Sequence, residues 1–483
     1  MILTRKIQLY IVTNSENEEE QEKEKNRVYK YLRDGMFNQN KAMNQYMSAL
    51  YVATVQDISK DDRKELNNLY RRISTSKKGS AYEKDIEFAK GLPSTASLGQ
   101  AVQQDFNKSC KDGLLTGKVS LPTYKKDNPL LVHVDYVRLR STNPHRDNGI
   151  YHNYSSHEEF LSHLYSNDLE VFIKFADNIT FKMVFGSPYK SHALRKEIQQ
   201  IFEEKYIVRG SSIQIDKGKK IMLNLSMDIP EQKKELNEDT VVGVDLGIAV
   251  PAMCALNNDM YKRCAIGNVN DFVRVRTKLQ AQRKRLSKSL KYASGGHGRK
   301  KKLKALERLS KSEANFVETY CHMVSKRVVD FALSNNAKYI NIENLKGYDT
   351  SDFVLRNWSY YKLQQYIKYK AERFGIVVRK VNPCYTSQVC SVCGNWEPDQ
   401  RKSQAVFECA NNDCDSYKKY DYGFNADFNA ARNIAMSTLF KEEGEIKEED
   451  KKAAREYYGI TEKYEQYEKE KENKKSAKKS KVA

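Results

Sequence analysis

Apolar residues in the first half of the chain change their spacing from one segment to the next. Residues 6–12 alternate between apolar and polar positions, whereas from Tyr29 to about Phe106 the apolar positions often recur at three and four residues, as in Leu98 and Val102. A period of two is typical of a half-buried strand, and a spacing of three to four is typical of a helix. The pattern therefore predicts an opening strand followed by a mainly helical region.

The period of two returns after Gly117. Apolar residues alternate over 169–175, a turn signal, Asp177-Asn178, follows, and the alternation resumes over 179–183. Two alternating runs joined by a short turn predict a β-hairpin. A further alternating run covers 221–229, so this region is rich in strands, although the pattern does not say which strands pair.

The chain divides at a polar run, residues 231–239, that is typical of a linker. After it, strands alternate with helical segments, which predicts an α/β domain. We expect a multidomain fold, α+β before the linker and α/β after it, with a charged tail made of a frayed helix and a disordered basic end. The expected parts are a β domain in two pieces (1–14 and 117–230), a helical insertion (15–116), the linker (231–239), an α/β domain (240–383 and 421–440), a cysteine-containing segment (384–420) and the charged tail (441–483).

The net charge of the chain indicates which kind of molecule it binds. The 83 Lys and Arg residues outnumber the 63 Asp and Glu residues, giving a net charge of +20, which suits a polyanion such as nucleic acid better than a small neutral substrate. No apolar stretch is long enough to span a bilayer. The nine cysteines are an odd number in a chain without a signal peptide, which favours reduced thiols. We therefore expect a cytoplasmic protein without a membrane partner.

Three carboxylates stand at the ends of expected elements in the second half of the chain. Asp245 and Glu343 each end an apolar strand, and Asp427 precedes a run with helical spacing. Open α/β sheets place their ligand sites at the carboxyl ends of strands. Taken singly, each acid also fits an ordinary role, as a turn residue, a strand-end surface acid or a helix cap.

Metal ions would explain why the three acids occur together. Acids at close quarters repel one another unless cations neutralise them, and oxygen ligands favour Mg²⁺ or Mn²⁺. We expect two such cations, with Asp245 contacting both and with Glu343 and Asp427 each completing one site. One ion would lower the pKa of an attacking water and the other would stabilise a leaving 3′ oxygen, which predicts phosphodiester hydrolysis without a protein general base.

Four cysteines have the spacing of a structural zinc site. Cys390 and Cys393 are separated by two residues, Cys409 and Cys414 by four, and the two pairs by fifteen. Four thiolates close a tetrahedral site around one Zn²⁺ and leave no open catalytic position. The alternative is a set of four reduced thiols without a metal.

Basic residues are concentrated between Asn268 and Asn315, where acids are few. A glycine-rich stretch, 294–298, predicts a break between two helices. Such a density of like charge costs self-repulsion unless phosphates lie nearby, although a solvated pair of helices is the alternative. The candidate nucleic-acid contacts are Arg283, Lys284, Arg285, Arg299, Lys300, Lys301, Lys302, Lys304 and Arg308.

Several segments resemble a known family. VGVDLGIA (242–249), INIENLKG (340–347), YTSQVCSVCG (385–394) and DFNAARNIA (427–435) are similar to the compact type V-F CRISPR effectors and their transposon-encoded TnpB relatives. The resemblance covers about residues 240–440, and the three acids resemble the RuvC-like nuclease core of the RNase H fold. Residues 1–230 match only in layout, which implies a β-rich wedge domain carrying a helical recognition insertion, followed by a RuvC domain with an inserted zinc knuckle.

This resemblance implies an endonuclease loaded with a guide RNA that opens target DNA beside a T-rich adjacent motif and cuts both strands at one RuvC site. Base pairing with the guide would then supply the sequence specificity. Cleavage of single-stranded DNA in trans is a further implication. The alternatives are a TnpB-like transposon nuclease, a guide-dependent repressor that binds DNA without cutting it, and a structure-selective junction resolvase.

The resemblance also implies an asymmetric homodimer on one guide RNA. A guide:target heteroduplex of ~20 bp must lie in a basic channel, and roughly 230 residues precede the nuclease domain to build it. Two copies of the chain would enclose the heteroduplex better than one.

Overall fold

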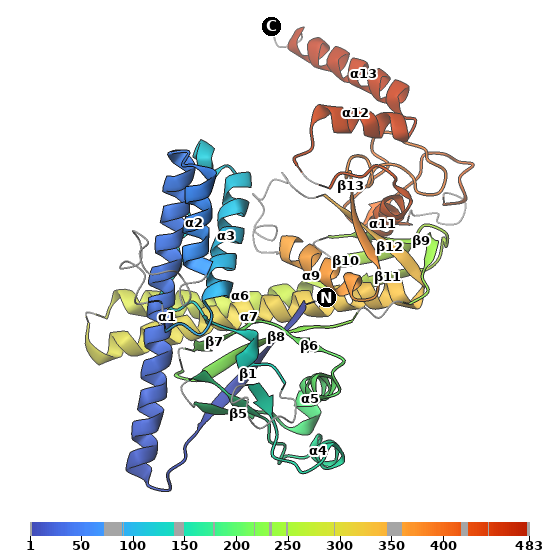
Figure 1. Ribbon diagram of the computed structural model, residues 1–483. Coiled ribbons are helices and arrows are strands. Elements are labelled where there is room, and N and C mark those ends of the chain that lie inside the picture. The colour runs from blue at the N-terminus through green and yellow to red at the C-terminus, as the bar shows by residue number, and fades with distance from the viewer. Residues whose placement is uncertain are drawn as a thin grey trace. The chain divides into compact units, whose positions relative to one another are not determined.

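The structure is a computed structural model, and it consists of two compact units, Met1–Pro230 and Glu231–Ala483 (Figure 1). The described residues are 2–71, 89, 91–139, 149–176, 179–216, 218–230, 234–247, 250–293, 295–344, 360–416, 424–442 and 444–480. None of the helices within these ranges combines the length and the apolar composition needed to cross a membrane.

The first unit contains an antiparallel sheet built around strand β1 (Ile2–Val12). Its order is β2-β7-β8-β1-β5-β4-β3, and β6 pairs with β8. The alternation of β1 buries Ile7 and Leu9, and Leu9 lies opposite both Ile221 and Met183. The other strands are β2 (Leu130–Val132), β3 (Gly149–Tyr151), β4 (Phe172–Lys174), β5 (Thr180–Val184), β6 (Ile207–Val208), β7 (Ser211–Ile215) and β8 (Ile221–Asp228).

The predicted hairpin is confirmed, because β4 and β5 pair antiparallel. Its expected turn, Asp177-Asn178, lies outside the described residues. Two further helices, α4 (His157–His163) and α5 (Pro188–Phe202), belong to the same unit, as do two short 3-10 turns, η2 (Leu114–Thr116) and η3 (Val134–Tyr136).

The predicted helical region is also confirmed, as α1 (Glu18–Val55), α2 (Lys60–Arg71) and α3 (Thr95–Lys111). Asn17 caps α1 by accepting a hydrogen bond from the Glu19 amide at 3.0 Å. The first half of α1 packs on the sheet through residues such as Leu32. Its second half packs against α3, where Tyr46 and Leu98 are buried. One helix therefore contributes to two hydrophobic cores.

The second unit contains a five-stranded mixed sheet with the order β11-β10-β9-β12-β13. The expected sequence of strand, basic helices, strand, helix and strand is present, and a hairpin that the pattern did not reveal, β10–β11, extends it. Strands β12 and β13 run parallel to β9, whereas β10 is antiparallel to it. The elements are β9 (Asn237–Asp245), β10 (Ala252–Leu256), β11 (Arg263–Ile266), α6 (Val269–Lys291), α7 (Gly296–Ser334), β12 (Ala337–Glu343), α9 (Tyr360–Glu372), β13 (Val377–Val381), β14 (Val406–Phe407), β15 (Phe424–Asn425), α11 (Ala426–Met436), α12 (Glu448–Tyr457) and α13 (Thr461–Ser480).

Helix α11 lies directly on the backbone of β9, and Gly243 makes this approach possible. A Cβ atom at Gly243 would stand 2.0 Å from the carbonyl oxygen of Ala431 and 2.3 Å from the amide nitrogen of Ala435. Neither of these backbone atoms can move away without shifting the helix. Gly243 is therefore required by a close backbone contact and not by a turn.

The charged tail is more ordered than expected, because the segment 441–483 contains two helices, α12 and α13, where one frayed helix and a disordered end were expected (Figure 1). Aromatic residues explain the difference. Ile460, Tyr464 and Tyr467 pack around Trp396 and Val389, which are both buried. The tail has nearly balanced charges and few apolar residues, so its composition alone did not indicate that these residues pack against partners outside the tail.

Replacing Gly243 tests the contact between β9 and α11. We expect Gly243→Ala to destabilise the second unit by about 1–3 kcal/mol or more, because overpacking forces backbone shifts. Each kcal/mol lowers the melting temperature of a unit of this size by about 2–4 °C, which differential scanning calorimetry can measure. Gly298→Ala is the matched control, because a Cβ atom there meets nothing within 4 Å. Equal melting temperatures for the two variants would contradict the contact.

Candidate functional site

The three acids lie at one edge of the second unit's sheet. Asp245 is the last residue of β9 and Glu343 is the last residue of β12. Because these two strands are parallel neighbours, their carboxyl ends meet at the same edge. Asp427 lies in the first turn of α11, which Asn425 caps by accepting a hydrogen bond from the Phe428 amide. The helix approach at Gly243 brings this turn next to the strand ends.

Electrostatic repulsion shows that the acids are close to one another. Burial, followed by repulsion from Glu343 and Asp427, raises the pKa of Asp245 well above its usual range. Burial raises the pKa of Glu343 to about 6 and also raises the pKa of Asp427. Asp245 is therefore the central acid of the three.

Two residues that the sequence analysis did not single out contact these acids. The Thr386 hydroxyl donates a hydrogen bond to Glu343 Oε1 at 2.7 Å. Arg401 Nη2 lies 4.0 Å from Asp427 Oδ1, and its charge lowers the pKa of all three acids. Both residues come from the cysteine-containing segment, and no spacing in the sequence distinguishes Arg401 from its basic neighbours.

Buried asparagines hold the elements of the site together. Asn433 Nδ2 donates to the carbonyl oxygens of Thr386 and Val389, both at 2.7 Å. Asn429 also donates to Val389 O, and it accepts from the Ser391 amide at 2.8 Å. Helix α11 therefore binds the chain just before the first cysteine pair on one face and β9 on the other.

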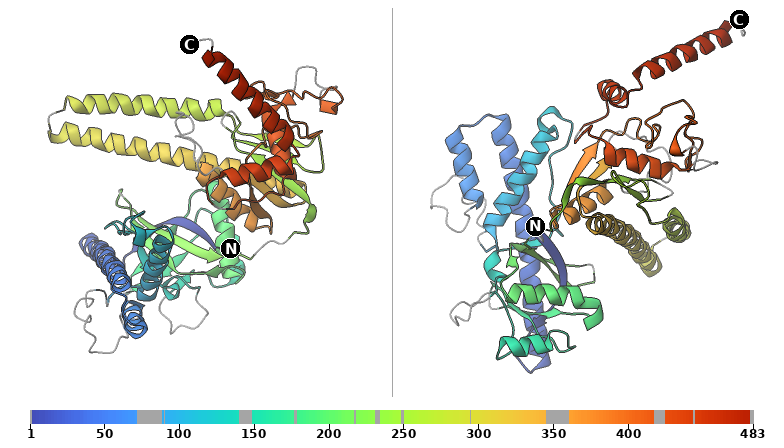
Figure 2. Two further views of the ribbon diagram at one scale, coloured as in Figure 1. Left: turned by 90° about the horizontal axis from the view of Figure 1, so that it is seen from above. Right: turned by 90° about the vertical axis from the view of Figure 1, so that its right-hand side faces the viewer.

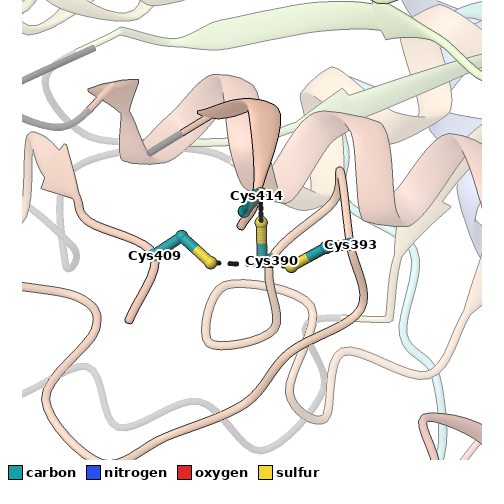
Figure 3. Close-up of side chains that lie close together, drawn as sticks. All are labelled: Cys390, Cys393, Cys409 and Cys414. Carbon is teal, nitrogen blue, oxygen red and sulfur yellow. Dashed lines mark hydrogen bonds between the residues drawn. The ribbon is translucent and has the colours of Figure 1, made fainter. Parts of the chain in front are cut away.

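The four cysteines converge as the spacing predicted, with Sγ atoms that all lie within 4.8 Å of one another (Figure 3). Cys390 and Cys414 Sγ are 3.8 Å apart, and Cys393 and Cys409 Sγ are 3.6 Å apart. A tetrahedron of ~2.3 Å Zn–S bonds has edges of about 3.8 Å, so the sulfur positions fit one zinc ion. Burial raises the pKa of the Cys390 thiol to about 11, which a bound cation would offset.

The three acids have a different arrangement from the thiols. Among the described residues, the cysteines are the set of possible ligands whose atoms all lie within 4.8 Å, and the acids do not form such a set. Carboxylates that do not all converge on one point can hold two cations ~3.5–4 Å apart. The oxygen donors fit hard divalent cations.

The nine candidate nucleic-acid residues all lie on α6 and α7, which pack antiparallel and extend beyond the sheet as an arm (Figure 2). Most of them are exposed, but some also have structural partners. Arg299 donates to Leu290 O at 3.1 Å and Lys302 donates to Ser289 O at 3.1 Å, so both satisfy carbonyls at the end of α6. Arg283 lies 3.7 Å from Glu313.

Comparisons with known proteins agree with this arrangement. Residues 360–434, which contain the cysteines and Asp427, match the family described as Cas12f1-like, TNB domain. The chain is 33% identical over 355 residues to the CRISPR-associated endodeoxyribonuclease Cas12f1 of Sulfoacidibacillus thermotolerans, covering 72% of this chain and 78% of that protein. A TnpB-like protein of Methanocaldococcus jannaschii is 36% identical over 119 residues, 23% of this chain and 42% of that protein.

A solved structure extends the likeness to the fold. The chain resembles the protein in a structure of a Cas12f1–sgRNA–target DNA complex with a TM-score of 0.63 and 19% identity, covering 91% of this chain and 99% of that one. The fold and these relatives define the class, which is that of the CRISPR-associated endodeoxyribonucleases. The chain belongs to the Cas12f1 family, the compact type V-F effectors related to TnpB.

Zinc content tests the cysteine site. We expect about one zinc per chain in the purified protein, and we expect Cys393→Ser to lose it, since three thiolates leave the tetrahedron open. Elemental analysis and melting temperature measure both effects. Cys110→Ser is the control, because Cys110 lies on α3 in the first unit and outside the cluster. A zinc-free preparation with an unchanged melting temperature would refute the site.

Proposed function

We propose that this endodeoxyribonuclease cuts DNA through Asp245, Glu343 and Asp427, which together would hold two Mg²⁺ or Mn²⁺ ions. The observation that carries the proposal is the position of the three acids, two at the ends of neighbouring parallel strands and the third in the first turn of α11. At this position Asp245 experiences repulsion from both other acids. Bound cations would relieve this repulsion, lower the pKa of the attacking water and stabilise the leaving oxygen. The sheet order supports a RuvC-type, RNase H-like assignment, since an antiparallel β11-β10-β9 meander is extended by two strands parallel to β9.

The chain's own residues have distinct roles in this proposal. Asp245, the central acid, contributes to both cation sites, and Glu343 and Asp427 each complete one. The Thr386 hydroxyl orients Glu343. Arg401 adds a positive charge next to Asp427, where it would attract a phosphate and favour the ionised acids.

The four-cysteine site would act as a structural zinc knuckle that keeps these two residues in place. Thr386 precedes the first cysteine pair and Arg401 lies between the two pairs. A zinc ion would tie together the two cysteine pairs that flank Arg401 in the sequence. The segment between the pairs would then be a closed loop, which limits the positions that the Arg401 guanidinium can reach. The knuckle would thus affect the rate of DNA cleavage without contacting the phosphodiester that is cut.

A guide RNA directs the cutting, and target DNA is the substrate. The chain belongs to a family whose members are named CRISPR-associated endodeoxyribonucleases, and it resembles a protein solved with an sgRNA and target DNA. The arm formed by α6 and α7 supplies exposed Lys and Arg for phosphate contacts. We propose that the first unit contains the wedge domain and the recognition lobe. We also propose that the protein requires a T-rich adjacent motif beside its target and that it cleaves single-stranded DNA in trans.

Neutralising the central acid tests the cutting site. We expect Asp245→Asn to reduce DNA cleavage by about 10³-fold or more, because the groups that stabilise a transition state's charge are worth that much, while guide and target binding stay within about twofold. The variant should also lose the rise in melting temperature that Mg²⁺ gives the parent protein. Asp239→Asn is the matched control, an exposed acid on the same strand. Efficient cutting by Asp245→Asn would exclude the assignment.

We further propose that two copies of the chain assemble asymmetrically on one guide RNA, through the helices of the first unit. Helix α1 supports this proposal because it exposes three large apolar side chains, Phe37 at 51%, Val52 at 47% and Val55 at 60%. In this proposal these side chains form the apolar part of the interface. Phe37 and Val55 are eighteen residues apart, which is five helical turns, so they share one face.

The mass of the assembled complex tests the dimer. We expect mass photometry of the protein with its guide RNA and target DNA to give a mass that contains two 56.0 kDa chains. The change Phe37→Glu with Val55→Glu should shift the mass to one chain, since it places charge in an apolar contact. A fully active complex with a single chain would rule out the dimer and favour a TnpB-like monomer.

A further inference from the structure

The cysteine cluster of Figure 3 is largely buried among apolar side chains. Cys390, Cys409 and Cys414 are each 1% or 2% exposed, and they pack with Phe407 and Phe424 in one hydrophobic cluster. Four thiolates outweigh the charge of one Zn²⁺ ion, so the complete site would carry a net negative charge. A buried charge is costly unless hydrogen-bond donors or an opposite charge accompany it. The proposed zinc site therefore needs partners beyond its four ligands.

Backbone amides supply part of this compensation. Burial raises the pKa of the Cys390 thiol, and hydrogen bonds from the amides of Cys393 and Val392 act against it. Burial also raises the pKa of Cys409, and the amide of Asn411 acts against it in the same way. A hydrogen bond to the charged form of a group favours that form. These donors come from the spacers between the cysteines, so the local chain provides them.

Ser416 supplies a donor from outside the two spacers. It is 4% exposed, and its Oγ lies 2.9 Å from Cys414 Sγ and 3.6 Å from Cys390 Sγ. These two sulfurs belong to different cysteine pairs. A zinc-bound thiolate has no proton to give, so the Ser416 hydroxyl must be the donor. One side chain therefore contacts both halves of the site.

Arg432 supplies a positive charge from helix α11. It is 8% exposed, and its Nε and Nη1 atoms have no hydrogen-bond partner among the described residues. Burial lowers the pKa of Arg432, whereas the charges of Cys390 and Asp259 raise it. A buried guanidinium is costly unless an anion lies near it. The thiolate of Cys390 is such an anion once the metal is bound.

The position of Arg432 on α11 agrees with this role. Asn429 precedes it by three residues, which places the two side chains next to each other on the helix surface. The Asn429 side chain accepts a hydrogen bond from the amide of Ser391, the residue that follows Cys390. Arg432 therefore lies on the side of α11 that holds the first cysteine pair.

We propose that Ser416 and Arg432 stabilise the zinc-bound thiolates of Cys390 and Cys414 and so set the affinity of the knuckle for zinc. The inference rests on the proposed zinc site. Ser416 donates its hydroxyl hydrogen bond chiefly to Cys414, the nearer sulfur, and Arg432 offsets part of the negative charge from the side of α11. Both are positioning residues, because neither of them binds the metal.

Zinc competition tests the role of Ser416. We expect Ser416→Ala to weaken zinc binding by the full-length protein about tenfold, because groups that hydrogen-bond to metal ligands typically change metal affinity about 10- to 100-fold. The measurement is the transfer of zinc from the protein to a chromogenic chelator of known affinity.

Ser391→Ala is the matched control for this variant. Ser391 is also buried and is next to Cys390 in the sequence, but its hydroxyl has no hydrogen-bond partner among the described residues. Its removal therefore takes no donor from the sulfurs, and zinc affinity should stay within about twofold of the parent protein.

Cobalt spectroscopy separates a direct effect on the sulfurs from a general loss of structure. Co²⁺ in place of zinc gives a sulfur-to-metal charge-transfer absorption. A hydrogen bond lowers the energy of the sulfur lone pair, so removing the bond lowers the energy of this absorption. We expect Ser416→Ala to move the absorption to longer wavelength and Ser391→Ala to leave it unchanged.

The charge of Arg432 has its own set of variants. Arg432→Met removes the charge and should weaken zinc binding about tenfold, whereas Arg432→Lys keeps the charge and should recover part of the affinity. Arg263→Met is the control and should leave the affinity unchanged. Arg263 is an exposed arginine whose guanidinium lies 5.1 Å from the ring centre of Phe428, on the same helix as Arg432.

Three results would overturn the proposal. They are equal zinc affinities of Ser416→Ala and Ser391→Ala, a cobalt absorption that Ser416→Ala leaves unchanged, and equal zinc affinities of Arg432→Met and Arg263→Met. Failure of the zinc site itself is distinguishable, because the parent protein would then contain no zinc.

Discussion

The arrangement of the second unit depends on one contact, in which the backbone of α11 lies on the backbone of β9 at Gly243. Side chains usually keep a helix ~10 Å from a sheet, and here a glycine removes that spacing. The consequence is electrostatic as well as steric. The first turn of α11 carries Asp427 to the strand ends, where its charge adds to the repulsion on Asp245.

The other face of α11 shows why this contact affects more than the acids. Asn429 and Asn433 hold the chain at Thr386, Val389 and Ser391, and this chain leads directly to Cys390. Buried amides are costly unless they are fully hydrogen-bonded, so these asparagines specify one position for the segment. A single helix therefore sets the strand-end acids, the hydroxyl that contacts Glu343 and the cysteine cluster relative to one another.

Local patterns made much of this arrangement predictable. An apolar run that ends in an acid predicts a buried strand with a carboxylate at its end, and Asp245 and Glu343 both follow that pattern. The cysteine spacing predicted a cluster because four thiols at such intervals can reach one point. These features depend on neighbours within a few residues, which is the range over which a sequence pattern can be interpreted.

Features that depend on distant partners could not be predicted. Arg401 is one of many basic residues until the fold places it 4.0 Å from Asp427. Gly243 looks like any strand glycine until Ala431, nearly 190 residues later, lies on it. The tail looked disordered because the residue that orders it, Trp396, lies outside the tail. The roles of the acids in catalysis remain a proposal, although their positions agree with it.

Helix α1 has a mechanical consequence for the first unit. It is one uninterrupted helix of 38 residues, and its two halves are buried in different cores, one against the sheet and one against α3. A rotation of the helical layer against the sheet would have to bend or break this helix, since no loop between the layers can absorb it within α1. A displacement of the helices of the first unit would therefore also displace its sheet, because α1 belongs to both layers.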